Sequence, residues 1–378
     1  MSTTGRSDGS TPAASDIASR LRAAEFVRLV ADATGDAVAA TGLLATALEG
    51  DTIAHQCSVV PVPASAQRET DADLTVGVGR HATDADITIG TAGPPASSTA
   101  LAVAEAFETI DYELALAGIT AAGAVPASDT LAAAEARGIE RRPGVAVPTA
   151  NLEDGLAHAT LVYAPFSGDT DATAATLTAL DSAETDEETQ RRVASMVAFE
   201  VCSDDGNAPQ AAEAVERFLR PLATVGGRFE TVEGFGDVLD ATARERPGLA
   251  VPLVLGAVEP EQALDVWRTH GQRAHEAVSS ASTGRYDGLY VVRCDGDQPV
   301  GTLARLVAAY RSPEPLVVAV DDSEAAAVAV EERDADLGSR VETAARRVDG
   351  RGGGTATVGR AQFSGDPTAF VAAFREVQ

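Results

Sequence analysis

The chain has 378 residues, of which 57 are acidic and 29 are basic, so its formal net charge is −28. All basic residues are arginine, and the absence of lysine excludes a P-loop lysine, a Schiff base and a lysine general base. The length predicts two domains or slightly more, and an apolar fraction of 45% supports real hydrophobic cores. Such dense carboxylates are typical of a halophilic protein, whose surface repulsion is screened by salt.

The three cysteines, Cys57, Cys202 and Cys294, lie far apart without CxxC spacing, so neither a zinc site nor a disulfide framework is expected. The sequence shows no signal peptide and no apolar run long enough to cross a membrane. We therefore expect a soluble, cytoplasmic protein with no membrane partner.

The first elements in chain order predict the opening of a βαβ unit. Residues 1–15 are polar and rich in Gly, Pro, Ser and Thr, which is typical of a disordered segment. Asp16 is expected to cap a helix over residues 17–26. A short β-branched run at residues 26–30 predicts a strand, and a turn of small and acidic residues follows at 31–36. Apolar residues then recur at helical spacing: Val38, Leu43, Leu44 and Leu48.

Three further strands are predicted at residues 56–62, 73–78 and 86–89, and a helix begins near Ser97. Strands separated by helical or turn-rich segments favour a mostly parallel sheet with right-handed crossovers. In such sheets ligands bind at the carboxyl ends of the strands.

Four strings follow these strands or lie in the next helix: residues 31–40 (ADATGDAVAA), 77–79 (GVG), 90–95 (GTAGPP) and 114–123 (LALAGITAAG). They resemble the four motifs of the DHH phosphoesterase superfamily, specifically those of the archaeal RecJ-like single-strand nucleases. In that family the motifs read roughly His-x-Asp-x-Asp-Gly, Asp-x-Gly, Asp-His-His and Leu-Ala-Leu-Ala-Gly with a later Asp. Here the small and apolar residues match, but the family's metal-ligand positions are Ala31, Ala33, Gly35, Gly77, Gly90, Thr91, Ala92 and Ala122.

Four longer segments of unusual composition resemble the archaeal RecJ-like group in particular. They are residues 142–148 (RPGVAVP), 155–158 (GLAH), 164–169 (APFSGD) and 231–239 (TVEGFGDVL). The resemblance as a whole covers about residues 20–378. Helical periodicity dominates residues 170–222, where the acidic run 181–188 reads as a solvated helix face. Strands are predicted at 249–255, 288–293 and 316–320, with a helix before each of the latter two.

These observations predict four segments. They are a disordered lead (1–15), a DHH-like α/β domain (16–160), a helical connector (161–245) and a smaller C-terminal DHH-associated-like α/β domain (246–378). A cleft is expected between the two α/β domains.

The residue types at the family's metal-ligand positions determine whether metal-dependent hydrolysis is expected. Two-metal phosphodiester hydrolysis needs carboxylates and imidazoles that hold two ions roughly 3.5–4 Å apart, and Ala and Gly have no side-chain donor. We therefore expect no catalytic residue and no metal. An alternative remains open, in which Mn²⁺ or Mg²⁺ is held by nearby residues: Asp32, Asp36, His81, Asp84 and Asp86. His158, His270 and His275 have no matching spacing and are expected to be surface or packing residues.

A glycine-rich segment near the C-terminus carries the remaining candidate site. Residues 351–355 (RGGGT) resemble the Gly-Gly-Gly-His loop of the DHH-associated domain, which holds a nucleic-acid phosphate against backbone N–H groups. The histidine is replaced by Thr355, and the segment is one residue short. The expected phosphate-binding residues are Gly352, Gly353, Gly354, Thr355, Arg351 and Arg360, within the locally basic window 339–363. A tight turn whose arginines serve solubility is an equal alternative.

The resemblance implies a catalytically inert scaffold in DNA replication or repair, with GINS-like and MCM-like partners and weak binding of single-stranded nucleic acid. Two alternatives stay open: an active metal-dependent single-strand exonuclease with relocated ligands, and a binder of phosphate or nucleotides that uses the glycine-rich segment alone.

Overall fold

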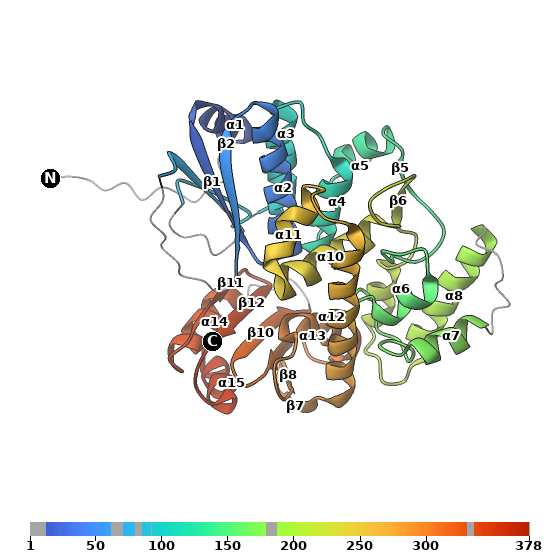
Figure 1. Ribbon diagram of the computed structural model, residues 1–378. Helices are drawn as coiled ribbons and strands as arrows, with labels where there is room; N and C mark the ends of the chain where they lie inside the picture. The colour runs from blue at the N-terminus through green and yellow to red at the C-terminus, as the bar shows by residue number, and fades with distance from the viewer. Residues whose placement is uncertain are drawn as a thin grey trace.

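The computed structural model describes residues 13–61, 71–79, 85–91, 93–178, 187–330 and 336–377. In the N-terminal part, four parallel strands form a sheet in the order β2-β1-β3-β4 (Figure 1). They are β1 (Phe26–Asp32), β2 (Ala54–Val60), β3 (Leu74–Val78) and β4 (Ile87–Ile89). Helix α2 (Gly35–Gly50) packs on this sheet, and α3 (Ala96–Ala106) and α4 (Tyr112–Ala121) pack on α2. The predicted parallel α/β sheet is confirmed.

The first helix differs from its prediction. Helix α1 spans Ala14–Ala23 and has Ala13 as its N-cap, so Asp16 lies in the first turn and makes no capping hydrogen bond. The helix ends before Phe26 because that residue already belongs to β1, where its N–H donates to the Asp73 carboxylate (2.9 Å). Residues 1–12 of the predicted lead lie outside the described residues.

A middle portion of mostly short elements leads to a long buried helix. The elements are α5 (Ser128–Glu135), β5 (Ile139–Arg141), α6 (Leu152–His158), α7 (Thr170–Thr178), α8 (Glu187–Ser203), α9 (Ala211–Glu216) and β6 (Leu222–Thr224). Most of the acidic run 181–188 lies outside the described residues, and α8 begins at its last two positions.

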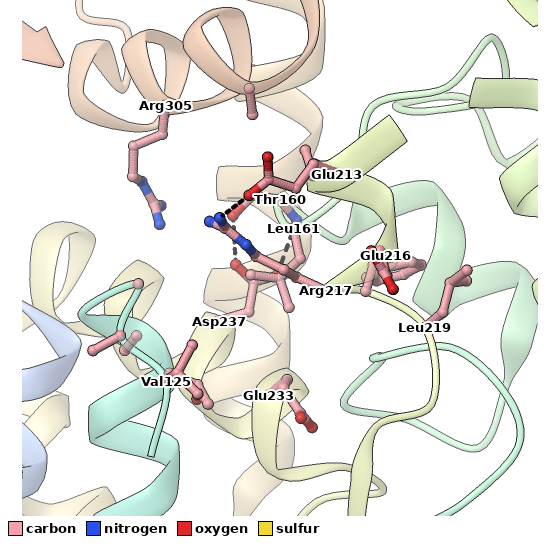
Figure 2. Close-up of a pocket in the computed structure, with 18 of the residues that line it drawn as sticks. Val125, Thr160, Leu161, Glu213, Glu216, Arg217, Leu219, Glu233, Asp237 and Arg305 are labelled. Carbon is pink, nitrogen blue, oxygen red and sulfur yellow. Dashed lines mark hydrogen bonds and ion pairs between the residues drawn. The ribbon is translucent and has the colours of Figure 1, made fainter. Parts of the chain in front are cut away.

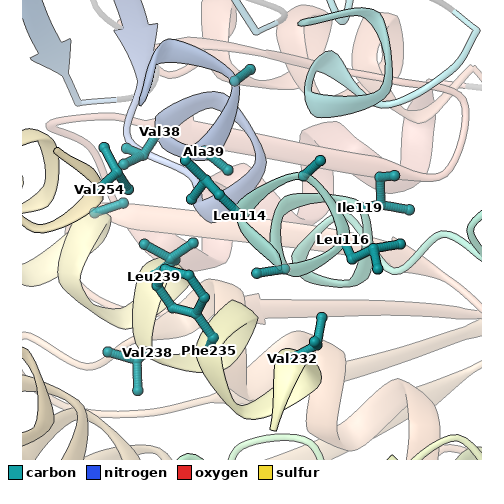
Figure 3. Packing of buried hydrophobic residues seen from close by; sticks show 14 of the residues in the cluster. Val38, Ala39, Leu114, Leu116, Ile119, Val232, Phe235, Val238, Leu239 and Val254 are labelled. Carbon is teal, nitrogen blue, oxygen red and sulfur yellow. The ribbon is translucent and has the colours of Figure 1, made fainter. Parts of the chain in front are cut away.

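Helix α10 (Val232–Glu245) is the long buried helix, and it packs against α2, α4 and α12. Its N-cap Thr231 accepts a hydrogen bond from Gly234 N. Figure 3 shows Phe235 and Leu239 of α10 facing Leu114 of α4 and Val38 of α2. The contact with α4 is close because residue 236 is glycine: a Cβ built there would lie 2.6 Å from the Ala117 carbonyl oxygen.

The predicted strand at residues 249–255 is wrong, because this segment forms helix α11 (Pro247–Val254). Proline at the first helical turn is compatible with helix initiation. Short apolar runs do not distinguish a strand from a buried helix. Here Val254 packs against Gly42 of α2, where a Cβ would lie 2.7 Å from the Val254 methyl group.

The C-terminal part is a six-stranded sheet in the order β11-β12-β10-β9-β8-β7, in which β8 and β9 are parallel and the other pairs are antiparallel. Its strands are β7 (Ser282–Tyr286), β8 (Leu289–Arg293), β9 (Leu316–Val320), β10 (Glu324–Ala329), β11 (Arg351–Gly354) and β12 (Val358–Gln362). The predicted strands at 288–293 and 316–320 are confirmed. Helix α12 (Pro260–Ser280) precedes the sheet.

The two faces of this sheet have different cores. Helix α13 (Val300–Leu306) and the π-helix η1 (Val307–Arg311) pack on one face, while α14 (Leu337–Arg346) and α15 (Pro367–Glu376) cover the other. In the part of the chain that the structure describes, the longest helices are too polar to span a lipid bilayer.

Candidate functional site

The strand register brings most of the expected ligand positions to one edge of the parallel sheet. Ala31 of β1 pairs with Val78 of β3, which pairs with Ile89 of β4, so Gly77 and Gly90 lie nearby. The structure describes seven of the expected ligand positions: Ala31, Ala33, Gly35, Gly77, Gly90, Thr91 and Ala122. Among these seven, only Thr91 has a polar side chain. Ala122 is exposed at the end of α4, and Ala92 lies outside the described residues.

Gly35, the first residue of α2, is enclosed by two other helices. A Cβ built on it would lie 2.8 Å from Ala121 Cβ of α4 and 3.0 Å from Asp240 N of α10. Neither neighbour is the flexible end of a long side chain. The packing of α10 therefore leaves no room for an aspartate at this position.

The described aspartates of the relocated-ligand alternative, Asp32, Asp36 and Asp86, have structural environments of their own. The Asp36 carboxylate accepts hydrogen bonds from the Ala96 and Ser97 N–H groups (2.8 Å each) and so caps α3. Asp86 precedes β4 at the opposite edge of the sheet and accepts from Thr75 N (2.8 Å). Asp32 is buried at the end of β1, where a Cβ on Gly79 would lie 2.4 Å from its Oδ2.

A pair of divalent ions does not fit these residues. Among the residues that the structure describes, no group of three or more His, Cys, Asp or Glu side chains is arranged to hold a metal ion. His81 and Asp84 of the relocated-ligand alternative lie outside those residues. The backbone atoms and single hydroxyl at the expected positions do not replace the carboxylates and imidazoles of a two-metal site.

A carboxylate from α10 lies at the N-terminus of α2 instead. Gly35 N donates to Asp240 Oδ1 (3.1 Å), and the same carboxylate accepts from Arg244 Nε and Nη2 (2.9 Å each) and from Arg305 Nη2 (3.0 Å). Burial alone would raise the pKa of Asp240, but the two arginines and the Gly35 N–H outweigh it and hold the pKa at about 2. Asp240 therefore joins α2, α10 and α13 as a permanent anion.

The sequence contains only part of the signal for this cluster. Asp240 and Arg244 are four residues apart on a predicted helical segment, which favours an ion pair. Arg305 and Gly35 are distant in sequence, and nothing in the local pattern places them beside Asp240.

A cavity of about 640 Å³ adjoins this cluster (Figure 2). Its walls come from the end of α4, from α9, from α10 and from the α13–η1 segment. Apolar groups include Val125, Leu161 and Leu306, and arginines project from several walls. The sequence patterns did not indicate this cavity, because its lining residues are scattered from 120 to 310.

Besides Asp240, two further buried carboxyl groups of α10 line the same cavity. Asp237 accepts from Thr160 N (2.9 Å), from the Thr160 hydroxyl and from Trp267 Nε1 (2.8 Å). Glu233 accepts from Leu222 N (2.9 Å), and burial raises its pKa to about 7.

The histidines of α12 are packing residues, as predicted. His270 donates or accepts at both ring nitrogens, with Glu245 Oε1 (2.8 Å) and Thr302 Oγ1 (2.9 Å) as partners. His275 Nε2 donates to the Ala159 carbonyl oxygen (2.9 Å), and burial lowers the pKa of this histidine to about 4. Both side chains are about 1% exposed.

The glycine-rich segment is a strand and not the expected loop. Residues 351–354 form β11, where Gly352, Gly353 and Gly354 pair with Ala361, Arg360 and Gly359. The turn falls at residues 355–358, where Thr355 N donates to the Val358 carbonyl oxygen (2.7 Å). A strand is possible because the glycines allow close contact: a Cβ on Gly354 would lie 2.1 Å from that same oxygen. The shortened segment thus closes a tight turn.

The basic window 339–363 is divided between the two faces of the C-terminal sheet. On α14, Arg340 donates to the Phe374 carbonyl oxygen (3.0 Å), and Arg347 pairs with Glu376 (3.0 Å) of α15. Arg351 and Arg360 lie on the other face, since Arg360 pairs across the sheet with Ala326 of the α13-side core. The Arg360 guanidinium packs against Gly301 of α13. The structure thus places the two predicted phosphate-contacting arginines on one face.

Residues 281–376 match the family model described as the C-terminal domain of uncharacterized protein rrnAC1427. The whole chain is 49% identical over 380 residues to uncharacterized protein rrnAC1427 of Haloarcula marismortui, with 100% of both chains covered.

Among solved structures, CDC45 from Entamoeba histolytica is similar with a TM-score of 0.57 and 12% identity, covering 96% of this chain and 98% of that one. A manganese-bound exonuclease RecJ gives a TM-score of 0.49 and 13% identity, covering 97% and 94% of the two chains. The likeness to CDC45 shows a shared fold, and the predicted α/β architecture with a mostly parallel N-terminal sheet and a C-terminal α/β part is confirmed.

Proposed function

The chain belongs to the family of the Haloarcula marismortui protein rrnAC1427, and we propose that it is a DHH-fold scaffold in DNA replication or repair that hydrolyses no nucleic acid. The observation that carries this proposal is the packing at Gly35. At this position the resemblance places a metal-binding aspartate, but α4 and α10 occupy the volume that its side chain would need. A hydrolytic centre without metal ligands lacks the charge that stabilises attacking and leaving oxygens.

The proposed partners are replisome proteins of the GINS and MCM type. This part of the proposal is supported by the fold shared with CDC45 and by the resemblance of residues 231–239 to the archaeal RecJ-like group, whose inert relatives accompany those complexes. A weak contact with single-stranded nucleic acid is proposed at the sheet face that carries Arg351 and Arg360.

Manganese titration and a nuclease assay test the loss of hydrolysis. Purified protein in molar KCl should bind no manganese stoichiometrically by calorimetry and should leave end-labelled single-stranded DNA intact. The scaffold proposal is wrong if the DNA is degraded and this activity disappears in Asp36→Ala. Asp86→Ala is the matched control, because Asp86 lies at the opposite edge of the sheet. Activity with relocated ligands would thus be recognised.

Light scattering with purified GINS and MCM proteins from the same host tests the partner assignment. A complex that survives molar KCl is the expected result. If neither protein binds while nucleotides raise the melting temperature, the replisome assignment fails and a nucleotide-binding role is favoured.

A further inference from the structure

The cavity beside α10 has a size and a lining that suit a small organic ligand. Its volume of about 640 Å³ lies within the range of roughly 300–1,000 Å³ that is usual for such sites. Apolar side chains of the α4–α5 connection, of residues 218–219 and of α13 form much of the wall: Ala124, Val125, Pro126, Phe218, Leu219 and Leu306. One wall is the π-helix η1, and π-helical turns occur frequently at functional sites.

The carboxylates that line the cavity already have donors within the protein. Asp237 accepts from Thr160 and Trp267, Glu233 accepts from Leu222 N, and Asp240 is held by two arginines. Glu213 pairs with Arg217 (2.9 Å), and the remaining acid, Glu216, is exposed to solvent. The acidic lining therefore offers little unused acceptor capacity inside the cavity.

Two guanidinium groups point into the cavity from opposite walls. Arg305 extends from α13 and Arg217 from the end of α9, and Figure 2 shows their guanidinium groups directed toward one another. Arg305 uses Nη2 to bind Asp240 and Thr302, while its Nη1 has no hydrogen-bond partner among the residues described in the structure. Arg217 uses Nη2 for Glu213. The unused capacity that faces the cavity is thus that of donors.

We propose that this cavity binds a small organic anion, whose carboxylate or phosphate lies between Arg217 and Arg305 and whose apolar body contacts Val125 and Leu161. Guanidinium groups suit both anions, since their N–H donors match the geometry of carboxylate and phosphate oxygens. The inference is independent of the proposed scaffold role, because it uses neither the sheet edge at Gly35 nor the strand β11.

Trp267 provides a direct readout of binding. It is the only tryptophan in the sequence, it is fully buried, and its Nε1 donates to the Asp237 carboxylate that lines the cavity. Titration of the full-length protein with octanoate or octyl phosphate should produce a saturable change in its fluorescence. The uncharged probe 1-octanol should produce a much smaller change. The tighter of the two anions identifies the ligand class as carboxylate or phosphate.

Three variants test the geometry. Arg217→Gln should weaken binding about tenfold, because a charge-assisted hydrogen bond to the anion is lost. Arg346→Gln is its matched control: both side chains are 70% exposed and both pair with a glutamate four residues earlier, but Arg346 lies outside the cavity. Ala214→Phe should block binding sterically from the α9 wall while both arginines are retained.

Three results would overturn the inference. The first is the absence of a saturable signal with either anion, in protein whose melting temperature shows it to be folded. The second is equal binding of 1-octanol, which would leave an apolar cavity without anion recognition. The third is unchanged affinity in both Arg217→Gln and Ala214→Phe, which would place the probe elsewhere.

Discussion

Replacing Gly35 by alanine tests whether packing excludes side chains from the expected ligand position. Gly35 begins α2, and its own backbone is not in the left-handed region, so an alanine there is strained only by its neighbours. The new methyl group would lie 2.8 Å from Ala121 Cβ and 3.0 Å from the Asp240 amide nitrogen. Both contacts are with rigid parts of helices, so α4 or α10 has to move.

The magnitude follows from two opposing terms. Inserting a methyl group into a well-packed core costs typically about 1–3 kcal/mol. Replacing glycine by alanine at a compatible site stabilises a protein by about 0.4–1 kcal/mol. Gly248→Ala isolates the second term, because Gly248 lies near the start of α11 and a Cβ there meets no atom within 4 Å. The two variants should therefore differ by about 1–3 kcal/mol in the free energy of unfolding.

Urea denaturation at constant KCl concentration measures this difference without changing the ionic strength. Gly248→Ala should unfold at the same or a higher urea concentration than the parent, and Gly35→Ala at a lower one. If Gly35→Ala is as stable as Gly248→Ala, α10 can move to accommodate the added methyl group at little cost in free energy. The exclusion of a metal-binding side chain would then have no physical basis.

Three further perturbations have defined outcomes. Asp240→Asn should lower the free energy of unfolding by about 3 kcal/mol in urea, because two partly buried guanidinium groups lose their counter-ion. Since the pKa of Asp240 is about 2, its contribution to the free energy of unfolding is present above pH 4 and is lost as the pH falls from about 4 to about 2. Acid titrations followed by circular dichroism should show this loss in the parent protein and not in Asp240→Asn. The buried neutral His275 has a pKa of about 4, so stability should fall as the pH drops from about 6.5 to about 4, and His275→Gln should flatten that slope in the same measurement. Arg351→Gln and Arg360→Gln should each weaken binding of single-stranded DNA evenly across sequences and reduce the salt slope by roughly 0.7 per lost phosphate contact, measured by fluorescence anisotropy; unchanged binding in both would exclude this face.

The parallel strands were predictable because their signal is local. The run at residues 26–30 is short, β-branched and followed by a turn, and it forms β1 with only small shifts in its bounds. Residues 249–255 have a similar composition but form α11, because Pro247 lies in the first helical turn and Val254 packs against Gly42. Composition alone does not distinguish these two cases, since the deciding contact comes from a distant helix.

For the candidate site at the sheet edge, the sequence predicted the path of the backbone but not the side chains that surround it. The small residues at positions 31, 35 and 77 do meet at one sheet edge, as parallel topology requires. What fills the space beside them depends on Asp240, which is 205 residues from Gly35 in sequence. The cavity between Arg217 and Arg305 likewise arises from elements that share no local pattern.

The contact between Gly35 and Asp240 explains why residue 35 is glycine in this chain. Glycine at position 35 is required by the approach of α10 and by the hydrogen bond that its N–H donates to Asp240. Gly42 and Gly236 are required by the packing of α11 and α4 in the same way. The packing of neighbouring helices thus requires small residues at these three positions. A matching set of small residues is therefore evidence for the fold, and the Asp240 carboxylate, paired with Arg244 and Arg305, places a negative charge at the N-terminus of α2.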